Sequence, residues 1–267
     1  MNREEQLEWE ARWSRPAAAA AVLGGVLPVA GQLLRIAALS DAGRNDRGAL
    51  IAFDERLGQL IASTTLSVLG FIIATGAMLY LWRASRARRE ETFAAAQPLL
   101  IAGVVGFSIA AIINLYEVLT IAGDFVDGPH TERRADDLLK DRSLIGGSIG
   151  LGGGLALVIA VVMISVGAMR AGLLSRFMGI LGVIVAAFNV LNIFPLPIVQ
   201  VFWFCALAVL FLDRWPGGRG PAWAAGEAIP WPSAMDQAKA REEAQQRELP
   251  EPEEPSAPKP SRKKRRR

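Results

Sequence analysis

Cysteine and histidine are almost absent from this chain: Cys205 and His130 are the only ones among its 267 residues. A single cysteine excludes an intramolecular disulfide and a cysteine-based zinc site. A single histidine excludes a histidine-based metal site, and no spacing in the sequence places a nucleophile near His130. We therefore expect no metal, no cofactor and no enzymatic activity.

Long stretches of the chain carry little or no charge. Hydrophobic residues make up 52% of the sequence and charged residues 21%, and the charges gather in blocks between apolar runs. Six runs are each close to the roughly 20 residues that an α-helix needs to cross about 30 Å of hydrocarbon. They cover residues 17–39, 57–82, 99–122, 144–169, 173–191 and 196–212. We therefore predict an all-α, polytopic membrane protein with a bundle of six transmembrane helices.

The segments before and between these runs are polar. Residues 1–16 are predicted to form a cytoplasmic amphipathic leader with Trp9 and Trp13 on one helical face. The glutamates of this leader argue against a cleaved signal peptide, so residues 17–39 should remain as a span. In the outer loops, residues 40–56 and 131–142 combine charges with short apolar patches, and each predicts a short amphipathic helix.

The count of lysine and arginine near the spans predicts the orientation. One side carries Arg3, Arg12, Arg15, Arg83, Arg86, Arg88, Arg89, Arg170, Arg176, Arg214 and Arg219, and the other carries Arg44, Arg47, Arg56, Arg133, Arg134, Lys140 and Arg142. Because the side richer in lysine and arginine is usually cytoplasmic, we expect both termini inside. The outer loops are also rich in acids, which makes the outer face net negative.

Polar side chains inside the predicted spans lie in the outer half of the bundle, whereas the inner half is almost purely apolar. The candidate binding residues are Gln32, Arg35, Asn114, Glu117 and Asn189. One interpretation is a polar vestibule open to the outside, in which Arg35 pairs with Glu117 because an isolated charge in the membrane is costly. The other is that helix ends become polar as they approach water, with Arg35 reaching the surface.

Glycines are concentrated at the start of the fourth run. Gly146, Gly150 and Gly154 follow one another at four-residue spacing and so predict a groove along one helical face. Small residues of this kind let another helix approach closely, and an internal helix is a more natural partner than a second copy. The cluster lacks the Lys-Ser/Thr ending of a phosphate-binding loop, so we expect no nucleotide site.

Residues 214–267 are rich in proline, glycine, glutamate and lysine, which predicts a disordered cytoplasmic tail. The tail ends in the basic cluster Arg262, Lys263, Lys264, Arg265, Arg266 and Arg267. One interpretation is binding to anionic lipid or the ribosome, at about 1 kcal/mol per charge near a lipid surface; the other is a solvated tail. No aromatic residue is interleaved with the basic cluster, so we expect no sequence-specific binding of nucleic acid.

The stretch 171–182, AGLLSRFMGILG, resembles the short inner loop and glycine-spaced helix of multi-pass membrane proteins of actinobacteria. The alanine- and arginine-rich composition and the basic tail are similar as well. That group has no assigned activity, so the resemblance implies no cofactor and no site. It implies a location in a bacterial cytoplasmic membrane.

Two functions from different classes fit the sequence. The first is a non-enzymatic membrane protein with a structural or anchoring role, whose partners are the lipid bilayer and an anionic surface bound by the basic tail. The alternative is a small transporter or channel that uses the outward-facing polar cluster around Arg35 and Glu117.

Overall fold

The computed structural model describes residues 2–40, 42, 45–91, 93–140, 143–191, 197–216 and 218–231, with only the backbone at residues 189–191. These residues form helices and no strand, which confirms the predicted all-helical fold. In chain order the helices are α1 (Arg3–Leu39), α2 (Asp46–Glu55), α3 (Leu57–Arg88), α4 (Ala96–Val126), α5 (Glu132–Lys140), α6 (Leu144–Arg170), α7 (Arg176–Leu191), α8 (Ile198–Phe211) and α9 (Pro221–Ala225).

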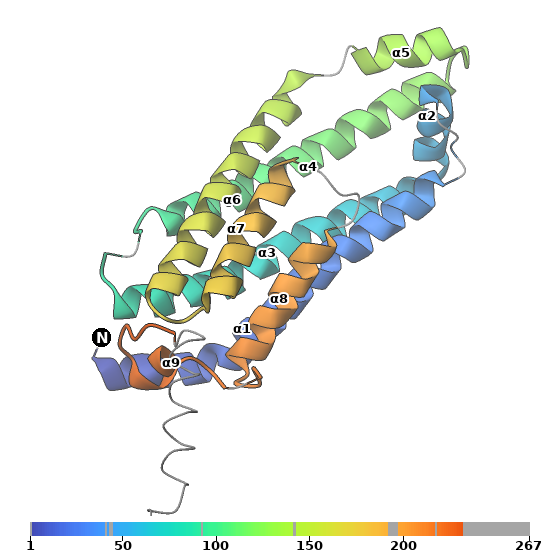
Figure 1. Ribbon diagram of the computed structural model, residues 1–267. Helices are drawn as coiled ribbons and strands as arrows, with labels where there is room; N and C mark the ends of the chain where they lie inside the picture. Colours follow the sequence, from blue (N-terminus) through green and yellow to red (C-terminus); the bar gives the residue numbers. More distant parts are fainter. Residues whose placement is uncertain are drawn as a thin grey trace, which may run out of the picture. The chain divides into compact units, whose positions relative to one another are not determined.

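The chain up to Trp231 is one compact unit built on a ring of helices. Around the ring, α1 packs on α3, α3 on α4, α4 on α6, α6 on α7, α7 on α8, and α8 again on α1. Figure 1 shows α2 and α5 at one end of this ring and α9 with the start of α1 at the other. We name these the outer end and the inner end, after the predicted orientation.

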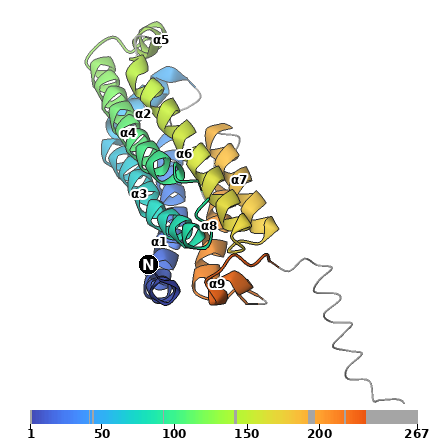
Figure 2. The ribbon, with the colours of Figure 1, turned by 90° about the vertical axis from the view of Figure 1, so that its left-hand side faces the viewer.

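Four of the ring helices, α1, α3, α4 and α6, are long and apolar enough to cross a membrane. The other two are shorter, with 16 residues in α7 and 14 in α8. At 1.5 Å per residue they are roughly 24 and 21 Å long, less than the hydrocarbon thickness of about 30 Å. Figures 1 and 2 both show α7 ending well short of the outer end. All six ring helices are therefore present near the inner end, and fewer of them surround the interior near the outer end.

Helix α1 joins the predicted leader and the predicted first span into one helix of 37 residues. Its start is set by a capping box, in which the Asn2 side chain accepts from the Glu5 amide and the Glu5 carboxylate accepts from the Asn2 amide. Pro16 and Pro28 lie inside the helix. Since proline removes a helical hydrogen bond and crowds the preceding turn, it accounts for a change of direction such as the one near the start of α1 in Figure 1.

Two short helices lie in the predicted outer loops. Leu50 of α2, Ala135 of α5 and the α4 residues Ala122 and Phe125 are buried together in a small apolar core. In α5, the hydrogen bond from Lys140 to the carboxylate of Asp136 raises the pKa of Lys140. Both short helices thus pack on the end of α4 through one apolar face, and most of their charged side chains are exposed.

The folded unit continues further than the composition of the last part of the chain predicts. Residues 218–231 follow the predicted tail boundary at 214, yet Trp223 of α9 is only 4% exposed and belongs to the main apolar core. Its indole N–H donates to the carbonyl of Leu173 at 3.0 Å. A proline- and glycine-rich segment with several tryptophans is held here by aromatic burial. Residues 232–267 lie outside the described residues.

Candidate functional site

A cavity of about 660 Å³ lies inside the ring, between the polar outer halves of the long helices and the ends of α7 and α8. Its polar lining comes from α1, α3, α4 and α8. These side chains are Gln32, Arg35, Ser63, Thr64, Ser67, Asn114 and Gln200. Ligand cavities in proteins typically measure about 300–1,000 Å³, so this space is large enough for a small molecule.

The cavity brings together three of the five side chains predicted to form an outer polar cluster. Gln32, Arg35 and Asn114 line it. Glu117 is half-buried, and it is not one of the described lining residues. The side chain of Asn189 lies outside the described residues. Among the ion pairs of the described part of the chain, none joins Arg35 to Glu117.

Several polar groups of the cavity wall are hydrogen-bonded within their own helices. The hydroxyl of Ser63 donates to the Leu60 carbonyl, that of Ser67 donates to the Ser63 carbonyl, and the Asn114 amide donates to the Ala110 carbonyl. Such back-bonding satisfies the donors of polar residues in an apolar helix. Arg35 is the one charged side chain among the described residues that line the cavity.

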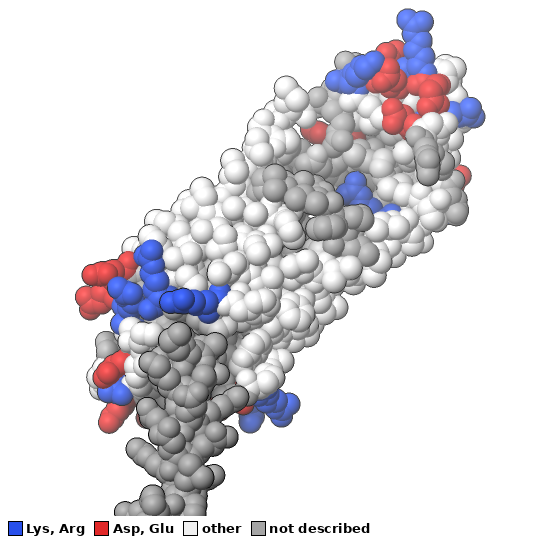
Figure 3. Space-filling model, in the orientation of Figure 1, with Lys and Arg blue, Asp and Glu red and all other residues white. Residues whose placement is uncertain are grey.

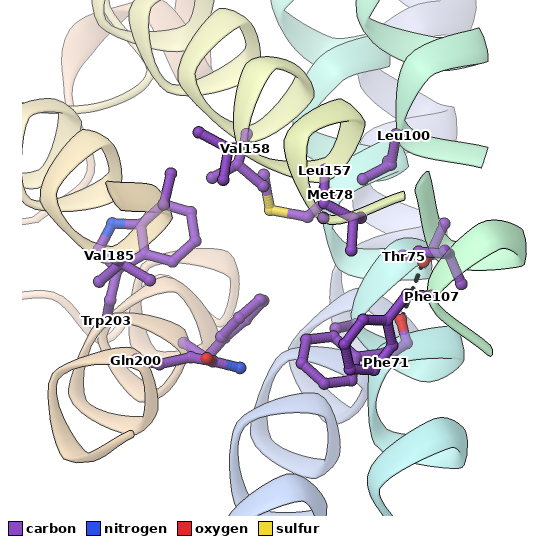
Figure 4. Close-up of a pocket in the computed structure, with 16 residues that line it drawn as sticks. Phe71, Thr75, Met78, Leu100, Phe107, Leu157, Val158, Val185, Gln200 and Trp203 are labelled. Atoms are coloured by element: carbon purple, nitrogen blue, oxygen red, sulfur yellow. Dashed lines mark hydrogen bonds between the residues drawn. The ribbon is translucent and has the colours of Figure 1, made fainter. Parts of the chain in front are cut away.

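A second, smaller cavity of about 90 Å³ adjoins the first on its inner side. Its lining is almost wholly apolar and includes Met78, Leu100, Leu157 and Trp203 (Figure 4). Four residues line both cavities, namely Phe71, Phe107, Val185 and Gln200. The rings of Phe71 and Phe107 lie 4.6 Å apart between centroids. A polar compartment therefore meets an apolar one at a boundary formed by two aromatic rings, a valine and one amide.

Gln200 is the buried polar residue at that boundary. Its side chain is 5% exposed, and its Oε1 has no hydrogen-bond partner among the described residues. Figure 4 shows the amide directed away from α8 toward the side of the cavity where Phe71 lies. A buried polar group without a partner costs about 1–3 kcal/mol. The sequence does contain a signal, because Gln200 is the one amide in the otherwise apolar run 196–212, but Gln200 is not among the residues predicted to form the outer polar cluster.

No protein-family model, curated protein or solved structure matches this chain. The chain's own residues and their arrangement are therefore the only basis for a function.

A charged network at the inner end was not predicted from the sequence. The guanidinium of Arg88 at the end of α3 makes two hydrogen bonds to the Glu10 carboxylate of α1, at 2.5 and 2.9 Å. Both side chains are buried, with exposures of 0% and 4%. Arg88 also donates to the Ala222 carbonyl at 2.9 Å, and Gln6 donates to Glu10 at 2.8 Å. With its charges neutralised and its donors used, this network holds α1, α3 and α9 together.

The predicted glycine face is found only in part. Cβ atoms at Gly146 and Gly150 would approach Ile113 and Ala110 of α4, which is an internal helix. Nothing lies within 4 Å of a Cβ at Gly154, and this residue instead lines the small apolar cavity. The closest approach to α4 is at Gly153. Since a helix has 3.6 residues per turn, a strict four-residue spacing drifts off the contact face, and the contact passes to Gly153.

Within the described residues, no cluster of three or more His, Cys, Asp or Glu side chains is placed to hold a metal ion. The basic cluster Arg262 to Arg267 lies outside the described residues.

Proposed function

We propose that the six apolar helices lie in a bilayer, with α2 and α5 at the outer surface and both termini on the cytoplasmic side. This proposal is supported by the large apolar side chains that point away from the interior of the ring and are exposed, among them Ile112, Leu151 and Phe202. Figure 3 shows charged side chains gathered at the two ends and a broad uncharged band between them on the face in view. Exposed apolar surface of this extent is typical of contact with lipid.

Within that membrane unit, we propose that the protein binds a small molecule in the cavity near its outer end, as a non-enzymatic transporter or binding protein. The observation that carries this proposal is the 660 Å³ cavity, which contains Arg35 and the amides of Gln32 and Asn114. A charged side chain in the outer half of a bundle is costly unless a partner or water reaches it. A hydrated, ligand-binding cavity removes that cost.

Cysteine labelling of intact cells tests this proposal. In a Cys205→Ala background, Ala111→Cys places a thiol in the large cavity, and Ala74→Cys places one in the small apolar cavity. A membrane-impermeant maleimide added outside is expected to label most of the Ala111→Cys protein and little of the Ala74→Cys protein. We expect water to favour the first site, which has a partly polar lining, over the second, whose lining is almost wholly apolar.

The two variants are matched because both change an alanine in a long helix of the ring. Labelling of Ala111→Cys only after the cells are opened would contradict the orientation. Labelling of neither variant in any preparation would contradict a cavity open to water.

A second function, anchoring to an anionic surface, is favoured by the charge at the inner end. Arg83, Arg86 and Arg89 lie there at the end of α3, and the basic cluster of the predicted tail follows in the sequence. In this proposal the membrane unit holds a polybasic tail next to anionic lipid or the ribosome.

Removing residues 250–267 is therefore expected to weaken binding of the protein's inner face to anionic liposomes, because each basic charge near such a surface contributes about 1 kcal/mol. Binding is measured by flotation of nanodiscs with liposomes at low salt. A second variant replaces residues 262–267 by glutamines, which removes their charge while keeping the length of the tail. Equal flotation of the intact and shortened proteins would rule out tail recruitment.

A further inference from the structure

The two adjoining cavities share four lining residues and differ in the chemistry of the others. The outer one is lined partly by polar side chains, including Arg35, and the inner one is lined by apolar side chains such as Trp203, Met78 and Leu100. An inorganic anion would fill only the first compartment, and a hydrocarbon only the second. A molecule with a charged head and an apolar chain matches both.

The charge of the site selects the sign of the head. Arg35 is the one charged residue among the described lining residues, so the site favours an anion. Arginine suits a carboxylate because its planar guanidinium donates two parallel hydrogen bonds. The acidic outer loops oppose the approach of small anions from water. An amphiphile that reaches the site from the bilayer avoids much of that repulsion.

Gln200 is a second, independent sign of a ligand at the boundary. Its amide is more than nine-tenths buried, and its Oε1 has no partner among the described residues. The inner compartment, at about 90 Å³, is smaller than the 150 Å³ cavity that holds benzene in other proteins, so it suits the end of one slender alkyl chain. Polar and apolar parts of a bound molecule would meet beside Gln200.

We propose that the two cavities form one site for a single-chain anionic amphiphile, a fatty-acid-like carboxylate. Its head lies at Arg35, and its alkyl end passes Phe71 and Phe107 into the apolar compartment. This assignment rests on the proposed binding function and adds the class of ligand.

Binding of decanoate to the purified full chain in neutral-lipid nanodiscs tests the head-group part. Empty nanodiscs provide the correction for partition into lipid, and decanol is the uncharged comparison. Arg35→Gln is expected to weaken decanoate binding by roughly tenfold or more, because a charge-assisted hydrogen bond is lost. Decanol binding should be unaffected. Arg47→Gln, which removes the same charge from an exposed position on α2, is the matched control and should change neither.

Gly154→Leu tests where the chain goes. Gly154 lines the apolar compartment, and a Cβ there meets nothing within 4 Å, so the leucine fills the space without a backbone clash. It is expected to weaken decanoate binding and to leave hexanoate binding unchanged. Gly152→Leu, at an exposed position with equal room for a Cβ, should alter neither.

Three results would overturn the assignment. They are the absence of decanoate binding to the unmodified protein, equal effects of Arg35→Gln and Arg47→Gln, and equal losses of hexanoate and decanoate with Gly154→Leu. If Ala111→Cys is labelled from outside while decanoate does not bind, the proposed cavity function stands and only the ligand class is wrong. If Ala111→Cys is labelled in no preparation, including opened cells, the cavity function itself fails.

Discussion

Replacing Arg88 by alanine is expected to destabilise the folded unit by about 3–5 kcal/mol, because it leaves the carboxylate of Glu10 buried without its cation. The two side chains are 0% and 4% exposed, so water does not replace the lost partner. The same substitution also removes the hydrogen bond from Arg88 to the Ala222 carbonyl. Unfolding is measured by tryptophan fluorescence against temperature or SDS in a fixed detergent.

Two comparisons separate the buried charge from other effects. Glu91→Ala breaks the exposed pair with Arg89 and is expected to cost no more than about 1 kcal/mol. The double change Arg88→Met with Glu10→Leu removes both charges and should recover much of the loss, since apolar residues of similar size often replace a buried ion pair at little cost. If Arg88→Ala behaves like Glu91→Ala, the pair does not hold the inner end.

Arg88→Ala is also expected to affect the packing around Trp223. The guanidinium of Arg88 lies 5.6 Å from the centre of the Trp223 ring, and Trp223 stacks with Tyr80 at 6.1 Å. Loss of Arg88 should therefore loosen residues 218–231 before the ring unfolds. Faster trypsin cleavage after Arg219 in Arg88→Ala, at a temperature where the helices remain intact, is the expected readout.

Gly153→Ala is expected to destabilise the contact of α6 with α4 by about 1–3 kcal/mol. A Cβ at this position would lie 2.7 Å from the Phe107 amide nitrogen and 2.9 Å from the Gly106 carbonyl carbon. Both are backbone atoms, so the strain is relieved only if the two helices move apart. A lower midpoint of unfolding in the same detergent assay measures the effect.

Gly152→Ala is the matched control, because it makes the same change one residue earlier where a Cβ meets nothing within 4 Å. It is expected to be neutral, or slightly stabilising through the better helix propensity of alanine. A loss as large as that of Gly153→Ala would show that glycine at this turn of α6 serves the helix itself and not its contact with α4.

Part of the fold was predictable because it depends on short-range properties of the chain. The length and hydropathy of residues 57–82 and 99–122 predict helices that α3 and α4 contain in full. The apolar patch that holds Leu50 predicts the buried face of α2. The glycines of the fourth run indicate a contact face, although the helical period moves its centre to Gly153.

The candidate site was predictable only in part, because it depends on contacts between helices as well as on short-range properties of the chain. Polar residues near the outer ends of apolar runs can be found by reading along the chain, and Gln32, Arg35 and Asn114 do line one cavity. Their sequence positions do not say which of them face each other. The expected partner of Arg35, Glu117, does not pair with it among the described residues.

By itself, the sequence determined the helical class, the long apolar segments and the polar residues near one end of them, because each follows from the composition of a continuous segment. Only the tertiary structure decided the rest. Glu10 and Arg88 are 78 residues apart, and Trp223 reaches Leu173 across 50. The polar lining of the outer cavity comes from four separate helices, α1, α3, α4 and α8. Contacts and voids of this kind depend on which helices become neighbours, and no local pattern in the chain encodes that choice.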